Sequence, residues 1–506
     1  MSQTETPQRR ISPLELCPDD FRTLGYRTVD RIAEHLRSIH QNPVTRGESP
    51  RVIRQLLGAG PLPHDGEDPF RILEEAADLL MGHSLFNGHP RFFGYITSSA
   101  APIGALADLL AGAINPNVGG WALSPVASEI EAQTVRWIAE MIGYPADCGG
   151  LLVSGGNMAN FVCFLSARKA KIGWDIRVSG VAGGQNRKLR VYASKETHTW
   201  IQKAADLFGL GTDAIRWIPT DRKLRMDVPF LRKQIENDKV NGDIPIMVVG
   251  TAGSVSTGAV DPLPDLAGIC REHQLWFHVD GAYGGFAAVL PDASEDLKGL
   301  SLADSVAVDP HKWLYAPLEA GCALVRTPAH LTDAFSYHPP YYHFPDDEGD
   351  APINFHEHGP QNSRGFRALK VWLALKQVGR KGYIQMISED ISLARALFDR
   401  VSAYPELQRF TCELSITTFR FVPPDLKPGG EETEKYLNQL NTELLTRLQN
   451  GGETFLSNAV IGESFVLRAC VVNFRTSLQD IQAVPDIVIR IGKEVDQEMR
   501  QRTPGG

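Results

Sequence analysis

The sequence has few cysteines, no long apolar run and no excess of basic residues. Its seven cysteines are scattered without paired short spacing, so we expect reduced thiols rather than a disulfide framework or a metal site. The most apolar stretch, 102–114, contains Asp108 and is too short to span a bilayer. Lysine and arginine (51) are outnumbered by aspartate and glutamate (60), which argues against a general nucleic-acid binder. No secretory signal is visible near the start, so we expect a cytoplasmic protein that binds neither membrane nor nucleic acid.

The chain is long enough for more than one domain. It has 506 residues, of which 43% are hydrophobic and 22% charged, as in ordinary globular proteins. From about residue 95, short apolar runs alternate with stretches of helical period. This alternation predicts an α/β fold with a mainly parallel sheet covered by helices on both faces. We predict an N-terminal helical arm over 1–95, a large domain over 96–380 and a small C-terminal α/β domain over 381–506.

The individual elements follow from the same patterns. An amphipathic helix is expected over 19–36, a loop over 58–69 and a long helix from about 366 through 375. The segment 337–365 is rich in proline, histidine and acidic residues, which predicts a functional or mobile loop. Strands of the large domain are predicted at 150–154, 189–194, 215–219, 246–250, 275–280, 305–309 and 322–326, and strands of the small domain at 416–423 and 465–474.

A lysine directly follows one of these buried strands. The strand ends at Asp309, and His311 and Lys312 come next. A lysine at the end of a buried strand can be partly desolvated, which lowers its pKa and makes the amine nucleophilic. Trp313 and Leu314 would supply the apolar surroundings. Taken alone, such a His-Lys pair is more often a surface turn.

Three other strand ends carry residues suited to a cofactor. Asp280 closes a strand ahead of a glycine-rich turn, where a carboxylate could pair with a protonated pyridine nitrogen, although capping of the next turn is also common. The segment 154–157 (Ser-Gly-Gly-Asn) leads into a helix and could cradle a phosphate, or form a plain glycine turn. His198 follows a third strand and could stack on a flat ring or be a structural histidine. Each of these four signals is weak alone. Together they are specific, because the phosphate loop, the histidine, the aspartate and the lysine follow one another in that order along the chain.

With these residues in place, the sequence resembles the group II pyridoxal-phosphate decarboxylases, a family that includes aromatic-L-amino-acid, glutamate and cysteine-sulfinate decarboxylases. The resemblance covers nearly the whole chain, through the segments 24–26, 89–102, 115–131, 310–313 and 365–375. It implies the aspartate-aminotransferase-like fold (fold type I) and a homodimer with active sites shared at the subunit interface. It also implies a small-molecule amino-acid substrate and an enzyme of the carboxy-lyase class.

The resemblance assigns roles residue by residue. Eight residues match the family's site for pyridoxal 5'-phosphate: Gly155, Gly156, Asn157, His198, Asp280, Ala282, His311 and Lys312. Lys312 matches the lysine that binds the cofactor covalently, Asp280 the partner of the pyridine nitrogen and His198 the histidine stacked on the ring. The resemblance also places a proton-donating tyrosine in a loop after the lysine. Tyr341 is the best match, with Tyr342 as its neighbour, so the catalytic residues would be Lys312, His198 and Tyr341.

The sequence gives less direct evidence about the substrate than about the cofactor. A tyrosine rather than a phenylalanine at position 341 favours decarboxylation to an amine over aldehyde synthesis. Residues 251–253 look more like glutamate decarboxylases, and Gly119 and Gly120 stand where animal aromatic decarboxylases hold bulkier side chains. Possible apolar pocket residues are Phe92, Phe93, Tyr95 and Trp121, and Arg91 is the only nearby cation. We therefore favour an aromatic L-amino acid of the Trp, Tyr, Phe or Dopa type.

Three alternatives stay open. The chain could decarboxylate an acidic amino acid such as glutamate, aspartate or cysteine sulfinate. It could be an aromatic aldehyde synthase on the same scaffold. It could also bind pyridoxal phosphate without catalysis, although the set of Lys312, Asp280 and His198 argues against that reading.

Overall fold

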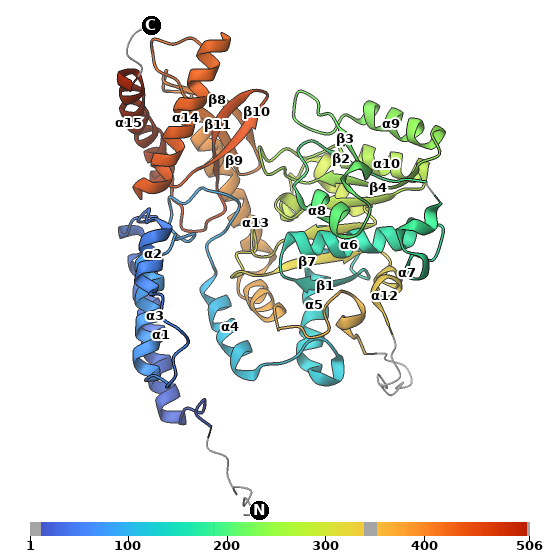
Figure 1. Ribbon diagram of the computed structural model, residues 1–506, viewed down its shortest axis with the longest axis horizontal. Coiled ribbons are helices and arrows are strands. Elements are labelled where there is room, and N and C mark those ends of the chain that lie inside the picture. The colour runs from blue at the N-terminus through green and yellow to red at the C-terminus, as the bar shows by residue number, and fades with distance from the viewer. Residues whose placement is uncertain (1–11, 186, 338–351, 503–506) are drawn as a thin grey trace, which may run out of the picture.

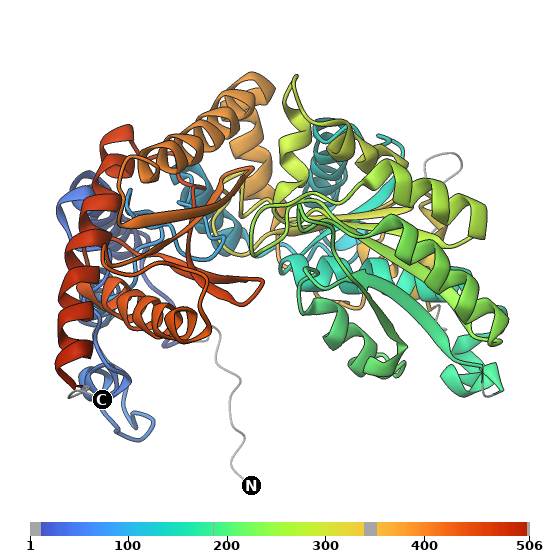
Figure 2. The same ribbon diagram turned by 90° about the horizontal axis from the view of Figure 1, so that it is seen from above.

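The computed structural model describes residues 12–185, 187–337 and 352–502. It shows two lobes, a large and a small domain, and a helical arm that runs along one side (Figure 1, Figure 2). The arm consists of α1 (Pro18–Ser38), α2 (Pro50–Leu57) and α3 (Pro69–His83). Each helix begins at a proline that follows a capping side chain, namely Cys17, Ser49 and Asp68.

The chain after the arm joins the small domain before it enters the large one. Phe92 forms a β-bridge with Phe455, and the Phe93 amide donates to the Phe455 carbonyl at 2.8 Å. Helix α4 (Pro102–Ile114) then leads toward the large domain. The last residues of the predicted arm therefore pack in the small domain.

The large domain is built on a seven-stranded sheet in the order β1-β7-β6-β5-β4-β2-β3. Its strands are β1 (Gly149–Val153), β2 (Leu189–Ser194), β3 (Ile215–Ile218), β4 (Ile244–Thr251), β5 (Trp276–Asp280), β6 (Ser305–Val308) and β7 (Gly321–Val325). β7 is antiparallel to both its neighbours, and the other pairs are parallel. The predicted α/β fold with a mainly parallel sheet is confirmed.

Helices cover both faces of this sheet. They are α5 (Pro125–Met141), α6 (Gly156–Lys171), α7 (Ile176–Ser179), α8 (Trp200–Leu207), α9 (Val228–Val240), α10 (Leu263–His273), α11 (Glu295–Lys298) and α12 (Ala329–Phe335). Alternate strand residues pack in two separate cores: Phe277 and Val279 of β5 pack on one face, and Trp276 packs on the other. Burial on both faces explains why these strands appear in the sequence as continuous apolar runs.

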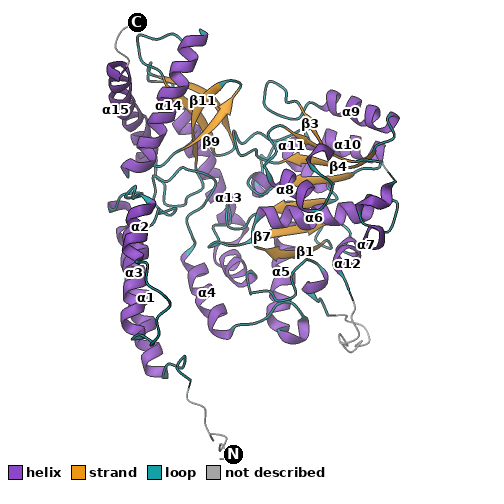
Figure 3. Cartoon of the chain, viewed as in Figure 1, coloured by secondary structure: helices purple, strands orange, loops and turns teal. Residues whose placement is uncertain are grey.

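Helix α13 (Ala368–Val401) connects the two domains. It is kinked at Gly379, whose φ of 65° and ψ of 168° interrupt the helix next to the predicted domain boundary. The small domain has a four-stranded antiparallel sheet in the order β10-β11-β9-β8 (Figure 3). Its elements are β8 (Leu407–Glu413), β9 (Ile416–Phe421), α14 (Glu431–Gly451), β10 (Ser457–Ile461), β11 (Ser464–Cys470) and α15 (Leu478–Arg502). Across the described ranges, no helix is both long and apolar enough to cross a membrane.

Candidate active site

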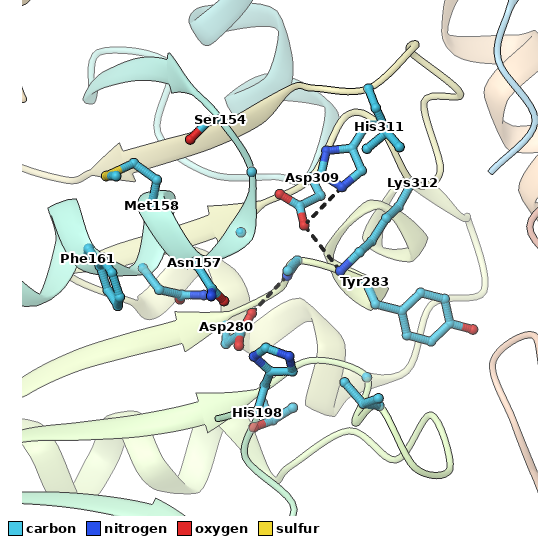
Figure 4. Close-up of a pocket in the computed structure, with 18 of the residues that line it drawn as sticks. Ser154, Asn157, Met158, Phe161, His198, Asp280, Tyr283, Asp309, His311 and Lys312 are labelled. Carbon is cyan, nitrogen blue, oxygen red and sulfur yellow. Dashed lines mark hydrogen bonds and ion pairs between the residues drawn. The ribbon is translucent and has the colours of Figure 1, made fainter. Parts of the chain in front are cut away.

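A cavity of about 420 Å³ lies at the carboxyl ends of the parallel strands of the large domain. Parallel strands deliver the residues that follow them to one edge of the sheet, and ligands of open α/β sheets bind there. Four segments that are far apart in the sequence meet at this edge: 154–161, 196–198, 280–283 and 309–312 (Figure 4).

Asp280, the last residue of β5, is held by two neutral donors. The Trp200 indole Nε1–H donates to Asp280 Oδ2 at 2.8 Å, and the Ala282 amide donates to Oδ1 at 3.1 Å. The residue is only 6% exposed, yet it lines the cavity. A buried carboxylate fixed in this way is suited to pair with a positively charged group of a ligand.

Lys312 lies in the turn after β6, beside a buried carboxylate. Its Nζ is 3.1 Å from Asp309 Oδ2, and His311 Nε2 lies 3.6 Å from the same oxygen (Figure 4). The other ring nitrogen of His311, Nδ1, is 2.7 Å from the Ala320 carbonyl, which fixes the ring. Burial lowers the pKa of His311. Asp309 therefore holds the lysine amine at the wall of the cavity.

Two glycines link β1 to α6, and each is required for a different reason. Gly155 adopts a φ of 126°, which strongly favours glycine, and it precedes the first residue of α6. A Cβ on Gly156 would lie 2.7 Å from Asp309 Oδ2 and 3.2 Å from the Ala282 Cβ. Backbone amides at the start of a helix lack intrahelical partners and attract anions. The loop can therefore cradle a phosphate group.

His198 lies on the open side of the cavity. Its Nδ1 accepts a hydrogen bond from the Trp200 amide at 3.3 Å, which leaves the proton on Nε2. Partial burial lowers the pKa of His198, and the Asp280 carboxylate acts in the opposite direction. A neutral, flat ring is thus available beside Asp280.

The residues present fit pyridoxal phosphate. Lys312 can bind an aldehyde carbon, Asp280 can face a pyridine nitrogen and the Gly155–Asn157 loop can hold a phosphate. Thr251 and Asp309 also line the cavity, and Thr251 Oγ1 and Asp309 Oδ1 are buried without a hydrogen-bond partner among the described residues. Such orphaned polar atoms are costly unless a ligand satisfies them. Fold and site together define a pyridoxal-phosphate enzyme of the α/β type.

Comparison with known proteins specifies the family. Residues 50–421 match the conserved domain of the pyridoxal-dependent decarboxylases, and the chain belongs to this family. It is a pyridoxal-phosphate-dependent amino-acid decarboxylase.

Similar proteins match over nearly their full length. The chain is 33% identical over 488 residues to the aromatic-L-amino-acid decarboxylase of Bacillus atrophaeus, covering 95% of this chain and 97% of that protein. It is 28% identical to the phenylacetaldehyde synthase of a Rosa hybrid cultivar, with 90% of each chain covered. A crystal structure of Oryza sativa TDC with PLP and tryptamine superposes with a TM-score of 0.87 at 27% identity, covering 96% and 99% of the two chains.

The structure brings all eight predicted cofactor residues together. Those that line the cavity are Gly155, Gly156, Asn157, His198, Asp280, Ala282, His311 and Lys312. Their roles toward the cofactor remain predictions. Tyr341 and Tyr342 lie outside the described residues.

The predicted apolar pocket residues do not line this cavity. Phe93 is fully buried in the core of the small domain, because the segment that carries it pairs with Phe455. Tyr95 is 56% exposed and packs its ring 6.0 Å from that of Phe455. Trp121 lines a different cavity, beside α5, and donates through Nε1 to Glu129 at 2.8 Å. In the described chain, the aromatic residues of the cavity wall are instead Phe161 and Tyr283.

Several residues of the site were not predicted from the sequence. The cavity is also lined by Asp309, Thr251 and Glu196. Trp200 does not line the cavity but donates a hydrogen bond to Asp280. Thr251 ends β4 and Glu196 follows β2, so the same rule about strand ends could have found them. Nothing local in the sequence links Trp200 to an aspartate 80 residues away.

Proposed function

We propose that this chain decarboxylates an aromatic L-amino acid to the corresponding amine and carbon dioxide. The observation that carries this proposal is the charge around the cavity. The lysine of the described lining is already paired with Asp309, and burial lowers the pKa of both His198 and His311. Within the described lining, this leaves no free cation to bind the carboxylate of an acidic side chain.

The remaining wall favours an apolar substrate with a polar edge. Phe161, Met158, Val255 and Tyr283 supply apolar surface. Glu196 adds a carboxyl group. Burial raises its pKa, and a hydrogen bond with Ser256 opposes that rise only in part. The name of the Bacillus relative and the tryptamine bound to the Oryza protein also support an aromatic substrate.

Each residue of the site has a task in this reaction. Pyridoxal phosphate, when bound, supplies the electron-accepting ring that takes up the electron pair as the carboxylate leaves. The Gly155–Asn157 loop would hold the phosphate, and Asp280 would stabilise a proton on the ring nitrogen. His198 covers the ring and orients it. Lys312 would hold the cofactor and later release the amine product, and the proton for the reacting carbon is assigned to Tyr341.

An amino-acid panel tests the substrate. The holoenzyme is incubated with Trp, Tyr, Phe, Dopa, Glu, Asp and cysteine sulfinate, and released carbon dioxide is measured. We expect turnover of one or more aromatic substrates at least tenfold above any acidic one, because an unpaired buried carboxylate is strongly disfavoured. Preferential turnover of an acidic substrate would overturn the proposal.

A second candidate function is aromatic aldehyde synthesis, favoured by the likeness to the Rosa phenylacetaldehyde synthase. The same panel separates the two reactions when amine, aldehyde and hydrogen peroxide are measured beside carbon dioxide. Both reactions release carbon dioxide, but an aldehyde synthase consumes oxygen and forms the aldehyde, ammonia and hydrogen peroxide in place of the amine. With Tyr341 as proton donor, we expect the amine as the main product.

We also propose that the protein is a homodimer with shared active sites. Helix α4 is strongly apolar, yet Leu106, Leu109, Leu110 and Ile114 on it are each more than 50% exposed. Gly104, on the buried face of α4, packs against Pro317, next to Leu318 on the cavity wall, so the helix that carries this apolar face lies close to the site. Contiguous exposed apolar surface of this kind marks a protein interface.

A cytoplasmic location is a further proposal. All seven cysteines are free thiols in the structure. Four of them, Cys163, Cys270, Cys322 and Cys470, are buried in the cores. This arrangement is typical of proteins kept in a reducing compartment.

A further inference from the structure

Trp200 contacts Asp280, the carboxylate that the proposed function assigns to the ring nitrogen of the cofactor. It is the first residue of α8, two positions after His198, and its side chain is fully buried. Its indole N–H lies 2.8 Å from Asp280 Oδ2, on the side away from the Ala282 amide that donates to Oδ1. Each oxygen of Asp280 therefore accepts one hydrogen bond from a neutral group of the protein.

The indole is fixed by a buried network behind the sheet edge. Its ring meets that of His278 edge-on, with 5.6 Å between centroids and an interplanar angle of 83°. The two nitrogens of His278 lie 2.7 Å from Asn160 Oδ1 and 2.8 Å from Ser305 Oγ. The Trp276 indole also donates to Ser305 Oγ, at 2.8 Å. Trp200 therefore has little freedom to turn away from Asp280.

This network supplies no positive charge to Asp280. Burial lowers the pKa of His278 to about 4, so its ring is neutral at physiological pH. Asp280 forms no ion pair with any residue in the described ranges, in contrast to Asp309, which has Lys312. The charge of a buried carboxylate without a cation depends on hydrogen-bond donors to stabilise it.

We propose that Trp200 is a positioning residue that keeps Asp280 charged and aimed at the ring nitrogen of the cofactor. The proton shared between the pyridine nitrogen and Asp280 can sit on either group. A hydrogen bond donated to Asp280 stabilises the carboxylate and so favours the proton on nitrogen. Trp200 thereby strengthens the electron-accepting power of the ring through Asp280, without touching the ring itself.

The variant Trp200→Phe tests this role. Phenylalanine keeps an aromatic ring against His278 and removes only the donor. The enzyme is loaded with cofactor labelled with ¹⁵N in the pyridine ring, and the nitrogen chemical shift is recorded without substrate. We expect the resonance to move toward that of unprotonated pyridine. In steady-state assays we expect kcat to fall about tenfold or more, with KM changed less than threefold, since a hydrogen bond to a charged group is lost.

A matched variant controls for the loss of an indole donor. Trp372 on α13 donates to Gln133 Oε1 at 2.7 Å, outside the cavity wall. Trp372→Phe should keep the wild-type nitrogen resonance and kcat. An unchanged nitrogen resonance in Trp200→Phe would overturn the proposal, whatever happens to the rate.

A second replacement covers the case in which Trp200→Phe does not fold. Benzothienylalanine at position 200 keeps the bicyclic shape and lacks the N–H, and it should give the same nitrogen shift. A wild-type nitrogen resonance in that protein would contradict the role of Trp200. Because the nitrogen shift is read without substrate, the result does not depend on which amino acid the enzyme accepts.

Discussion

At the scale of single residues, the chemistry is concentrated where strands end. Lys312, Asp280 and His198 could be predicted because each lies at or just after the end of a buried apolar strand, and parallel strands bring such positions together. Phe93 could not be placed correctly from the sequence. Its burial depends on Phe455, more than 360 residues later, and local patterns carry no information about such a contact.

The role of Lys312 gives a prediction at this scale. In Lys312→Ala the cofactor loses its covalent attachment, so we expect no cofactor mass on the protein after borohydride reduction. Intact-protein mass spectrometry measures the adduct. Decarboxylation should fall by at least about 10³-fold, as is common when a covalent catalytic group is removed.

The control is Lys203→Ala, which removes an exposed lysine of α8 that lies near His198 but does not line the cavity. It should retain the reducible adduct. A full adduct in Lys312→Ala would mean that another lysine carries the cofactor.

At the scale of elements, the turn that carries Lys312 rests on the long helix α13. Asp390 Oδ2 of α13 accepts hydrogen bonds from Trp313 Nε1 at 3.0 Å and from the Tyr315 hydroxyl at 2.6 Å. The Tyr383 hydroxyl, also on α13, donates to the Leu314 carbonyl at 3.1 Å. The start of this helix could be predicted from the sequence, but its length could not. A glycine such as Gly379 usually ends a helix, and here the helix resumes after the kink because both halves are packed against the rest of the protein.

Asp390 makes stability depend on pH. Burial raises the pKa of Asp390 to about 7, whereas the unfolded chain has the usual carboxyl value of 3.8. Between these values the folded protein binds the extra proton, so the free energy of unfolding decreases as pH rises, by at most about 1.4 kcal/mol per pH unit. Asn at this position can accept both hydrogen bonds without titrating. We expect Asp390→Asn to flatten the fall in Tm between pH 5 and 7.

Thermal melts at several pH values measure this slope. Asp399→Asn removes an exposed carboxylate from the same helix and should keep the wild-type slope. A slope in Asp390→Asn equal to that of the wild type would show that other groups cause the pH dependence.

At the scale of the whole molecule, the arm and α4 expose apolar side chains on the surface of the single chain. Phe21, Tyr26 and Val29 on α1 are each more than 40% exposed, as are the leucines of α4. The amphipathic period of α1 was visible in the sequence, and α1 closely matches the predicted 19–36. Among the described residues, nothing covers the side chains of Phe21, Tyr26 and Val29, so the sequence pattern alone could not show what lies against them.

The proposed homodimer makes a prediction about this surface. The wild type should sediment at twice the chain mass of 55.7 kDa. In the double variant Leu106→Asp with Leu110→Asp, two charges would enter an apolar interface, at a cost of several kcal/mol each. We expect a shift to monomer and a loss of activity of at least tenfold, measured by analytical ultracentrifugation and carbon dioxide release.

The control is Val240→Asp, whose side chain is 87% exposed at the end of α9, a helix far from α4 (Figure 1). It should remain dimeric and active. A double variant that stays dimeric would place the interface elsewhere.

The distribution of the thiols has a practical consequence. Cys17 caps α1 and is exposed, whereas the other six are buried or half-buried, and burial raises the pKa of each of them. A maleimide at neutral pH should therefore label the arm selectively. A fluorophore there would report, in the unmodified natural sequence, whether the arm is free or held against a second molecule.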